Sequence, residues 1–225
     1  SPTGVDSQVA FLPYSGKTGS NITVDNVVAN YTTYFNQGGT NFHSAGAVSF
    51  DATNGGVDGI EITRGNVTWS NLYVNNVQGI YSPALSIFNN FTGLSNSVFQ
   101  NIYSSNALGM VPNGIFIPVW LSNADITISD IVFDEIHIDN AYGAGFNFLL
   151  SSLVETSSTS VRTVVQGVTL KNLYLTDNNQ QRGTINSSGS VLYWGIGGLN
   201  IGNHGSGINI FDDLTIENLQ ATDSQ

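Results

Sequence analysis

One ten-residue pattern recurs along this chain and constrains its fold more than any other feature. Its clearest copy is 131–140, IVFDEIHIDN, in which apolar residues hold the first, third, sixth and eighth positions. The fifth position is Asn in five of the six copies and Glu135 in the remaining one. The copies begin at Ile22, Val67, Ser97, Ile131, Val168 and Leu214.

The spacing of the apolar residues requires each copy to bend. Side chains of a strand alternate between two faces, so the first and third positions share a face that the sixth and eighth do not. A straight strand would bury one pair and expose the other. Asn suits a bend at the fifth position because it tolerates left-handed backbone and can hydrogen-bond locally. Stacked Asn amides can also bond to one another.

A bent strand that recurs in this way is typical of a solenoid, in which each coil buries its apolar face against its neighbours. The fifth positions are separated by 30 to 46 residues, and no segment sustains helical periodicity. We therefore expect an all-β fold, a single right-handed parallel β-helix (β-solenoid) of about six coils. One interior column is expected to contain Leu72, Ile102, Ile136, Leu173 and Leu219.

Residues 1–225 are predicted to form a single β-helix domain, since no linker divides them. Residues 1–20 are expected to be a lead-in that caps the first coil or exchanges with a neighbouring chain. Short apolar runs predict the remaining strands of the coils at 47–50, 84–87, 114–117, 145–148 and 191–194.

Composition excludes several classes of function. Charged residues make up 9% of the chain, against roughly 25% in ordinary soluble domains. Five basic and sixteen acidic residues give a net charge of -11, which argues against nucleic acid and anionic membranes as partners. No apolar run approaches the roughly 20 residues of a membrane span. The chain has no cysteine, and we expect neither a metal nor a cofactor.

Five N-x-Ser/Thr sequons favour a secreted glycoprotein. They begin at Asn21, Asn30, Asn66, Asn90 and Asn186. The alternative is that several of them arise by chance in so Asn- and Thr-rich a chain. The numbered chain starts at Ser1 without a charged and then apolar leader, so we expect a mature extracellular product.

Coil-forming stretches such as 66–71 (NVTWSN) and 126–131 (ITISDI) resemble the right-handed parallel β-helix proteins of the pectate-lyase-like group, most nearly its polygalacturonase-like branch. That resemblance implies a polysaccharide hydrolase or lyase. The catalytic motifs of the group do not carry over. Where polygalacturonase-like enzymes place paired aspartates, Gly-His-Gly and Arg-Ile-Lys, this chain reads VQGIYSP (77–83), GMVPNG (109–114) and GFNF (145–148).

Two sets of residues are candidates for a functional site. The first is Asp134, Glu135, His137 and Asp139, which could form a carboxylate–imidazole or metal site. The alternative is a solvated outer face, since outward positions of a strand must be polar. We assign no catalytic residue beyond these candidates.

The second set occupies the seventh position in four successive coils and consists of Tyr73, Tyr103, His137 and Tyr174. Because coils stack at about 4.8 Å, these rings would form an exposed aromatic column on which sugar rings or neighbouring subunits could stack. The alternative is that tyrosines simply favour strands.

Three functions are compatible with this sequence. We favour a structural β-solenoid that self-associates as a subunit of an extracellular fibre or surface assembly. The alternatives are a polysaccharide-degrading enzyme of the pectate-lyase-like group and a tailspike-like module that binds glycans without cleaving them.

Overall fold

The part of the chain that the structure describes is built almost entirely of β-strands. The computed structural model describes residues 9–11, 19–30, 33–34, 48–50, 63–79, 85–87, 93–109, 115–119, 126–141, 145–150, 162–178, 184–185, 191–192, 199–203 and 208–222. Strands account for nearly all of these residues, and helices for none of them. It follows that the described part of the chain offers no helix able to cross a membrane.

The long strands form one parallel sheet, and each carries one copy of the ten-residue unit. These strands are β2 (Gly19–Asn30), β5 (Thr63–Gly79), β7 (Gly93–Gly109), β9 (Ile126–Ala141), β11 (Arg162–Thr176) and β15 (Ile208–Thr222). They pair in the order β15-β11-β9-β7-β5-β2, and the short β3 (Thr33–Tyr34) also pairs with β5. Strands that neighbour one another in the sheet are therefore whole coils apart in sequence.

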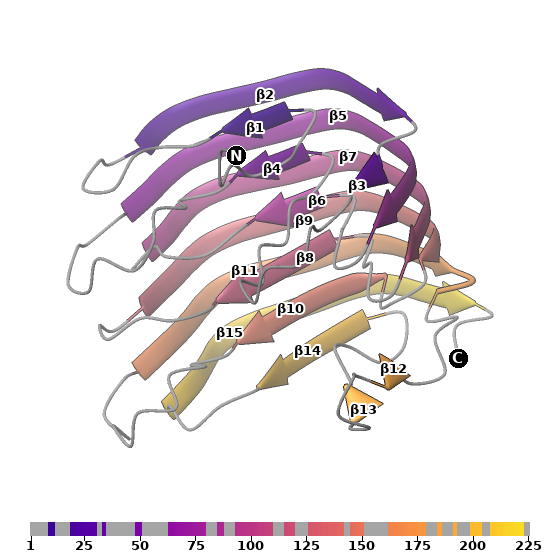
Figure 1. The fold of residues 1–225 in the computed structure, drawn as a ribbon. Coiled ribbons are helices and arrows are strands. Elements are labelled where there is room, and N and C mark those ends of the chain that lie inside the picture. Colours follow the sequence, from indigo (N-terminus) through magenta and orange to yellow (C-terminus); the bar gives the residue numbers. More distant parts are fainter. Residues whose placement is uncertain are drawn as a thin grey trace, which may run out of the picture.

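A second parallel sheet holds the shorter strands. It consists of β1 (Val9–Phe11), β4 (Val48–Phe50), β6 (Leu85–Ile87), β8 (Ile115–Val119), β10 (Phe146–Leu150) and β14 (Leu199–Asn203), paired in that order. From β4 to β11 the chain alternates between the two sheets, advancing by one coil at each return (Figure 1). The expected parallel β-solenoid of about six coils is confirmed.

Left-handed residues produce the bends that the sequence pattern requires. All six fifth positions, Glu135 included, have φ between 52° and 55°. Further left-handed residues flank the unit. They precede its first position at Asn21, Asn66, Asn96, Asp130, Gly167 and Asp213, and they occupy its tenth position at Asn76, Asn106, Asn140 and Asp177. The long strands thus turn at five-residue intervals, which keeps the first, third, sixth and eighth positions facing inward.

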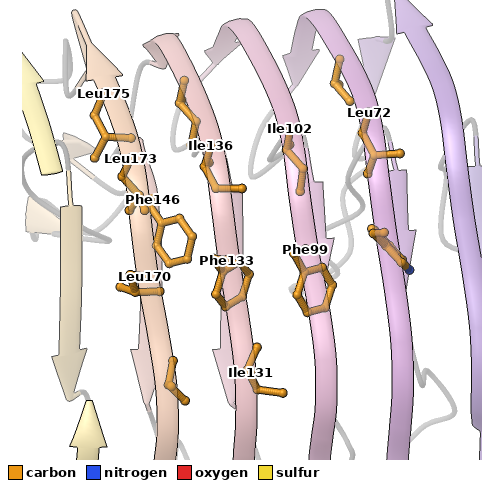
Figure 2. Packing of buried hydrophobic residues seen from close by; sticks show 14 of the residues in the cluster. Leu72, Phe99, Ile102, Ile131, Phe133, Ile136, Phe146, Leu170, Leu173 and Leu175 are labelled. Carbon is orange, nitrogen blue, oxygen red and sulfur yellow. The ribbon is translucent and has the colours of Figure 1, made fainter. Parts of the chain in front are cut away.

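Equivalent positions of successive coils lie in register and form columns. The sixth-position column runs Val27, Leu72, Ile102, Ile136, Leu173 and Leu219, so the predicted register is confirmed. Leu72, Ile102, Ile136 and Leu173 are interior as expected, whereas Leu219 in the last coil is 40% exposed because no described strand pairs with β15 on its outer side. In the third-position column the Phe99 and Phe133 rings stack with their centroids 4.9 Å apart, and Phe146 from the second sheet meets Phe133 edge-on. Figure 2 shows the buried members of these columns, among them Leu72, Ile102 and Ile136, as successive layers of one apolar core.

The structure also bears on two expectations about segments outside the ten-residue units, the run 191–194 and the lead-in 1–20. The run 191–194 was expected to supply a coil strand, but β13 (Val191–Leu192) pairs antiparallel with β12 (Thr184–Ile185) and β14 takes the place in the second sheet. That prediction was wrong because an apolar run alone does not fix which strand it joins. Within 1–20, β1 pairs with β4 of its own chain.

Candidate functional site

The seventh-position residues form a continuous stack of rings on the outside of the long sheet. Their strands are in register, so Tyr73, Tyr103, His137 and Tyr174 lie side by side on β5, β7, β9 and β11. Successive ring centroids are 5.1, 4.6 and 4.5 Å apart, with interplanar angles of 5°, 13° and 18°. Tyr73 and Tyr103 remain 39% and 36% exposed.

This geometry limits what the aromatic column can bind. Each inner ring is covered on both faces by its neighbours, and offset stacking of this kind stabilises the column itself. The column therefore presents ring edges to solvent. At the two ends of the column the register continues with Val28 beside Tyr73 and Gln220 beside Tyr174.

The four candidate residues of β9 divide into separate arrangements. Glu135 and His137 are in contact, with 3.4 Å between Oε2 and Nε2, and both are partly exposed. Asp139 is exposed at the outward ninth position. Asp134 is engaged elsewhere, since its carboxylate accepts a hydrogen bond from Asn172 at 2.9 Å and lies 3.1 Å from the Lys171 ammonium.

The electrostatics of Asp134 fit a structural role. Its partial burial raises the pKa of the carboxyl, but the hydrogen bonds from Asn172 and Lys171 and the Lys171 charge outweigh that effect and lower the pKa below 3.8. Asp134 is thus an ionised acceptor between two coils. Among the described residues, no three His, Asp or Glu side chains gather closely enough to hold a metal ion.

A ladder of polar side chains runs along the left-handed corners, and it has a direction. At the fifth position, Asn101 donates to Asn71 at 3.3 Å and Asn218 donates to Asn172 at 2.7 Å. Eight amide bonds between coils follow the same rule, with the donor nitrogen on the later coil. Each amide therefore turns its donor toward the preceding coil and its oxygen toward the following one.

At the first coil, Asp25 fixes the direction of these amide hydrogen bonds. Its carboxylate accepts hydrogen bonds from Ser70 at 2.7 Å and Asn71 at 2.8 Å. These bonds hold the pKa of the Asp25 carboxyl below its ordinary value. An ionised carboxylate can only accept, so Asn71 must donate with its nitrogen and leave its oxygen for Asn101.

One buried polar residue escaped the sequence pattern. Asn178 is fully buried just beyond β11, where it accepts a hydrogen bond from the Ala141 backbone N–H at 2.9 Å and donates to the Ile138 carbonyl at 3.1 Å. It ties two coils together through the backbone. Nothing in the surrounding run of polar residues distinguishes it from its neighbours in the sequence.

Three of the five sequons have described side chains. Asn21, Asn30 and Asn66 are all exposed, which glycosylation requires. Asn21 and Asn66 stand at left-handed corners of adjacent coils, and Asn66 donates to Asn21 at 3.3 Å. Asn90 and Asn186 lie outside the described residues.

The last coil exposes side chains that are buried in the coils before it. Leu219 is 40% exposed and Ile216 is 44% exposed, whereas their register partners on β11, Leu173 and Leu170, are fully buried. Phe211 is similarly exposed on the same strand. The described end of the stack is thus an apolar layer bordered by the free edge of a sheet.

Comparisons with models of known protein families, with curated proteins and with solved structures found no significant match. The parallel β-solenoid and its stacked columns are therefore the basis for assigning a function.

Proposed function

We propose that the chain is a secreted, glycosylated structural β-solenoid that serves as a subunit of an extracellular fibre or surface assembly. The observation that carries this proposal is the apolar end of the stack on β15. Ile216 and Leu219 occupy inward positions of the repeat, and a further coil would cover them as β15 covers Leu170 and Leu173. Burying such a layer is favourable at about 25 cal/mol per Å² of apolar surface.

The polar side chains support the same function, because the structure commits many of them to contacts along the solenoid axis. Asparagines, Asp25 and Asp134 bond from coil to coil, and the outer aromatic rings cover one another. Interactions of this kind join one coil to the next. They involve Asp134 and His137, two of the residues that the sequence analysis named as candidates for a carboxylate–imidazole or metal site. The exposed sequons at Asn21, Asn30 and Asn66 support an extracellular location.

The experiment is to measure self-association and polysaccharide activity on the same preparation. Sedimentation velocity over a wide range of protein concentrations, with electron microscopy of the concentrated sample, should reveal extended assemblies. A panel of neutral and acidic polysaccharides should show no increase in reducing ends or unsaturated products. A monodisperse monomer at high concentration that cleaves or binds a polysaccharide would replace the proposal by the enzymatic or glycan-binding alternative of the pectate-lyase-like group.

A further inference from the structure

We infer that two copies of this chain join head to tail, with β15 of one copy pairing in parallel with β2 of the next. This inference rests on the proposed function and specifies the contact through which the assembly forms. β2 and β15 are the two ends of the strand order in the long sheet and lie at opposite ends of the solenoid (Figure 1). Among the described strands, β2 and β15 each pair on one side only, and a strand edge left open in this way templates pairing with another chain.

The backbones of the two end strands match. β15 bends at Asp213 and Asn218, with φ of 59° and 52°, and β2 bends at Asn21 and Asn26, with φ of 57° and 55°. The register that joins β11 to β15 would therefore set Asn26 of the next copy against Asn218, with both bends aligned. The same register places Val24 beside Ile216 and Val27 beside Leu219.

The five-residue segment between bends excludes the antiparallel alternatives. Its first and third positions point inward and its second and fourth point outward, as the burial of β9 and β11 shows. Reversing the segment while keeping the bends aligned pairs the inward first position with an outward fourth position. Residues opposite one another in a sheet must share a face, so tail-to-tail or head-to-head pairing would sacrifice either the bends or the apolar layer.

The corner ladder selects the same polarity. Amide donors point toward the preceding coil, so the Asn218 oxygen faces the open end of the last coil, and the Asn26 amide of a following copy would supply its donor. At the neighbouring bend, the Asp213 carboxylate would accept from Asn21 of the following copy, as Asn21 itself accepts from Asn66. A head-to-tail contact thus continues two ladders without reversing either.

The two faces contribute unequally to the apolar layer. The tail offers Phe211, Ile216 and Leu219, all at least 40% exposed. On the head, Val24 and Ala29 are already buried within their own chain, while Ile22 and Val27 are partly exposed. The head therefore supplies mainly its strand edge and its corner amides, and the tail supplies most of the newly buried surface.

One pair opposes the contact. Glu217 would lie beside Asp25 of the next copy, and two like charges at about 5 Å in water-like surroundings weaken association about fourfold. Glu217→Gln is therefore expected to strengthen self-association by about that factor, and added salt should narrow the difference. If Glu217→Gln left the association constant unchanged at low salt, this register would be contradicted.

Cysteine cross-linking tests the register directly, because the chain has no cysteine of its own. Val28 and Gln220 occupy the same outward position on β2 and β15, so in the inferred contact their Cα atoms would lie about 5 Å apart, within disulfide range. Within one chain they are five strand spacings apart, about 24 Å, which no disulfide can span. A Val28→Cys and Gln220→Cys bond must therefore join two copies.

The single variants are oxidised alone and as a mixture, and covalent dimers are quantified under non-reducing conditions. We expect the mixture to yield the mixed covalent dimer, each variant alone to form no covalent dimer although it still self-associates, and the double variant to yield a series of covalent multimers. The matched control is Thr222→Cys mixed with Val28→Cys. Thr222 is exposed two residues beyond Gln220, so its Cα would lie about 8 Å from that of Val28, beyond disulfide range.

A second variant pair tests the apolar layer without disturbing the interior. Leu219→Lys places a charge on the inferred contact at a side chain that is 40% exposed, so the fold should persist while self-association is lost. Gln220→Lys on the same strand faces outward and should leave self-association intact. Circular dichroism verifies that both variants are folded.

The outcomes separate this inference from the proposed function. If the cysteine variants assemble but oxidation forms no bond between the Val28→Cys and Gln220→Cys variants, or instead links two copies of the Val28→Cys variant or two copies of the Gln220→Cys variant, the head-to-tail contact is overturned and a structural role still stands. Equal self-association of Leu219→Lys and Gln220→Lys would overturn the contact as well. Protein that stays monomeric at every concentration would overturn both.

Discussion

Replacing Glu135 by Asn tests whether the left-handed corners determine the stability of the coils. Glu135 has φ of 53°, and among the described left-handed residues it is the one that is not Asn, Asp or Gly. Left-handed backbone costs an ordinary residue roughly 1–2 kcal/mol, a cost that Asn escapes in part. Glu135→Asn should also place an amide in the ladder between Asn101 and Asn172, where a hydrogen bond contributes about 1 kcal/mol.

Two losses offset these gains. The half-exposed contact between Glu135 and His137 disappears, which costs about 0.2–1 kcal/mol. The shorter Asn side chain also covers less of the neighbouring surface. We therefore expect Glu135→Asn to raise the free energy of unfolding by about 1 kcal/mol, equivalent to about 2–4 °C in Tm for a chain of this size.

The assay is urea unfolding at a protein concentration low enough to prevent assembly, since association with a second copy would stabilise the folded state. One of the three tryptophans, Trp69, is fully buried, so tryptophan fluorescence should change when the core unfolds. Glu135→Gln is the matched control, because it removes the same charge, but Gln does not tolerate left-handed backbone as Asn does and its side chain is longer than those of the asparagines in the ladder. If Glu135→Asn were no more stable than Glu135→Gln, the reasoning about the corners would be refuted.

Three further substitutions probe the interior and the links between coils. Ile136→Asp should unfold the middle coils, seen as loss of the strand signal in circular dichroism, because a carboxylate there would be buried without a partner. Asp134 has a pKa lowered by Asn172 and Lys171 despite its partial burial, so its stabilising effect is present above its unfolded pKa and is lost as the pH falls through the folded value. Asp134→Asn should accordingly flatten the decline of unfolding free energy below pH 3.8, and an unchanged acid limb would contradict this. Asn178→Leu should cost about 2–4 kcal/mol in urea unfolding, because two buried backbone groups lose their partners; a loss under about 1 kcal/mol would show that those groups find other partners.

The sequence predicted the long coils because their side chains obey a local rule. In a straight strand the third and sixth positions would point to opposite faces, so the chain must bend between them for both to be buried. The structure places left-handed residues at all six fifth positions. The neighbouring corners were missed because they are filled by Asn, Asp and Gly in mixture, as at Asn96, Asp130 and Gly167. At Gly167 a side chain would also press on Asp130, since a Cβ would lie 3.0 Å from its Oδ1.

Pairing between short strands could not be derived in the same way. The run at 191–194 is as apolar as the second-sheet strands that were predicted correctly, yet β13 pairs with β12 and β14 joins β10. Such a choice depends on how the chain between the units is routed. Local periodicity carries no information about that route.

The candidate site was partly accessible to sequence reasoning. Register alone predicts that the seventh-position rings align, but the mutual covering of their faces depends on side-chain rotation, which the structure supplies. The commitment of Asp134 to Lys171 on the next coil likewise depends on register between segments 37 residues apart in sequence.

The most direct test of the central claim is the axial repeat of the assembled protein, measured by cryo-electron microscopy of filaments formed at high concentration. Head-to-tail pairing of six-coil units predicts a polar filament with a subunit repeat of about 29 Å, within which strands recur at about 4.8 Å along the axis. Filaments with two-fold symmetry across the junction, or a sample that contains only separate monomers, would contradict the account.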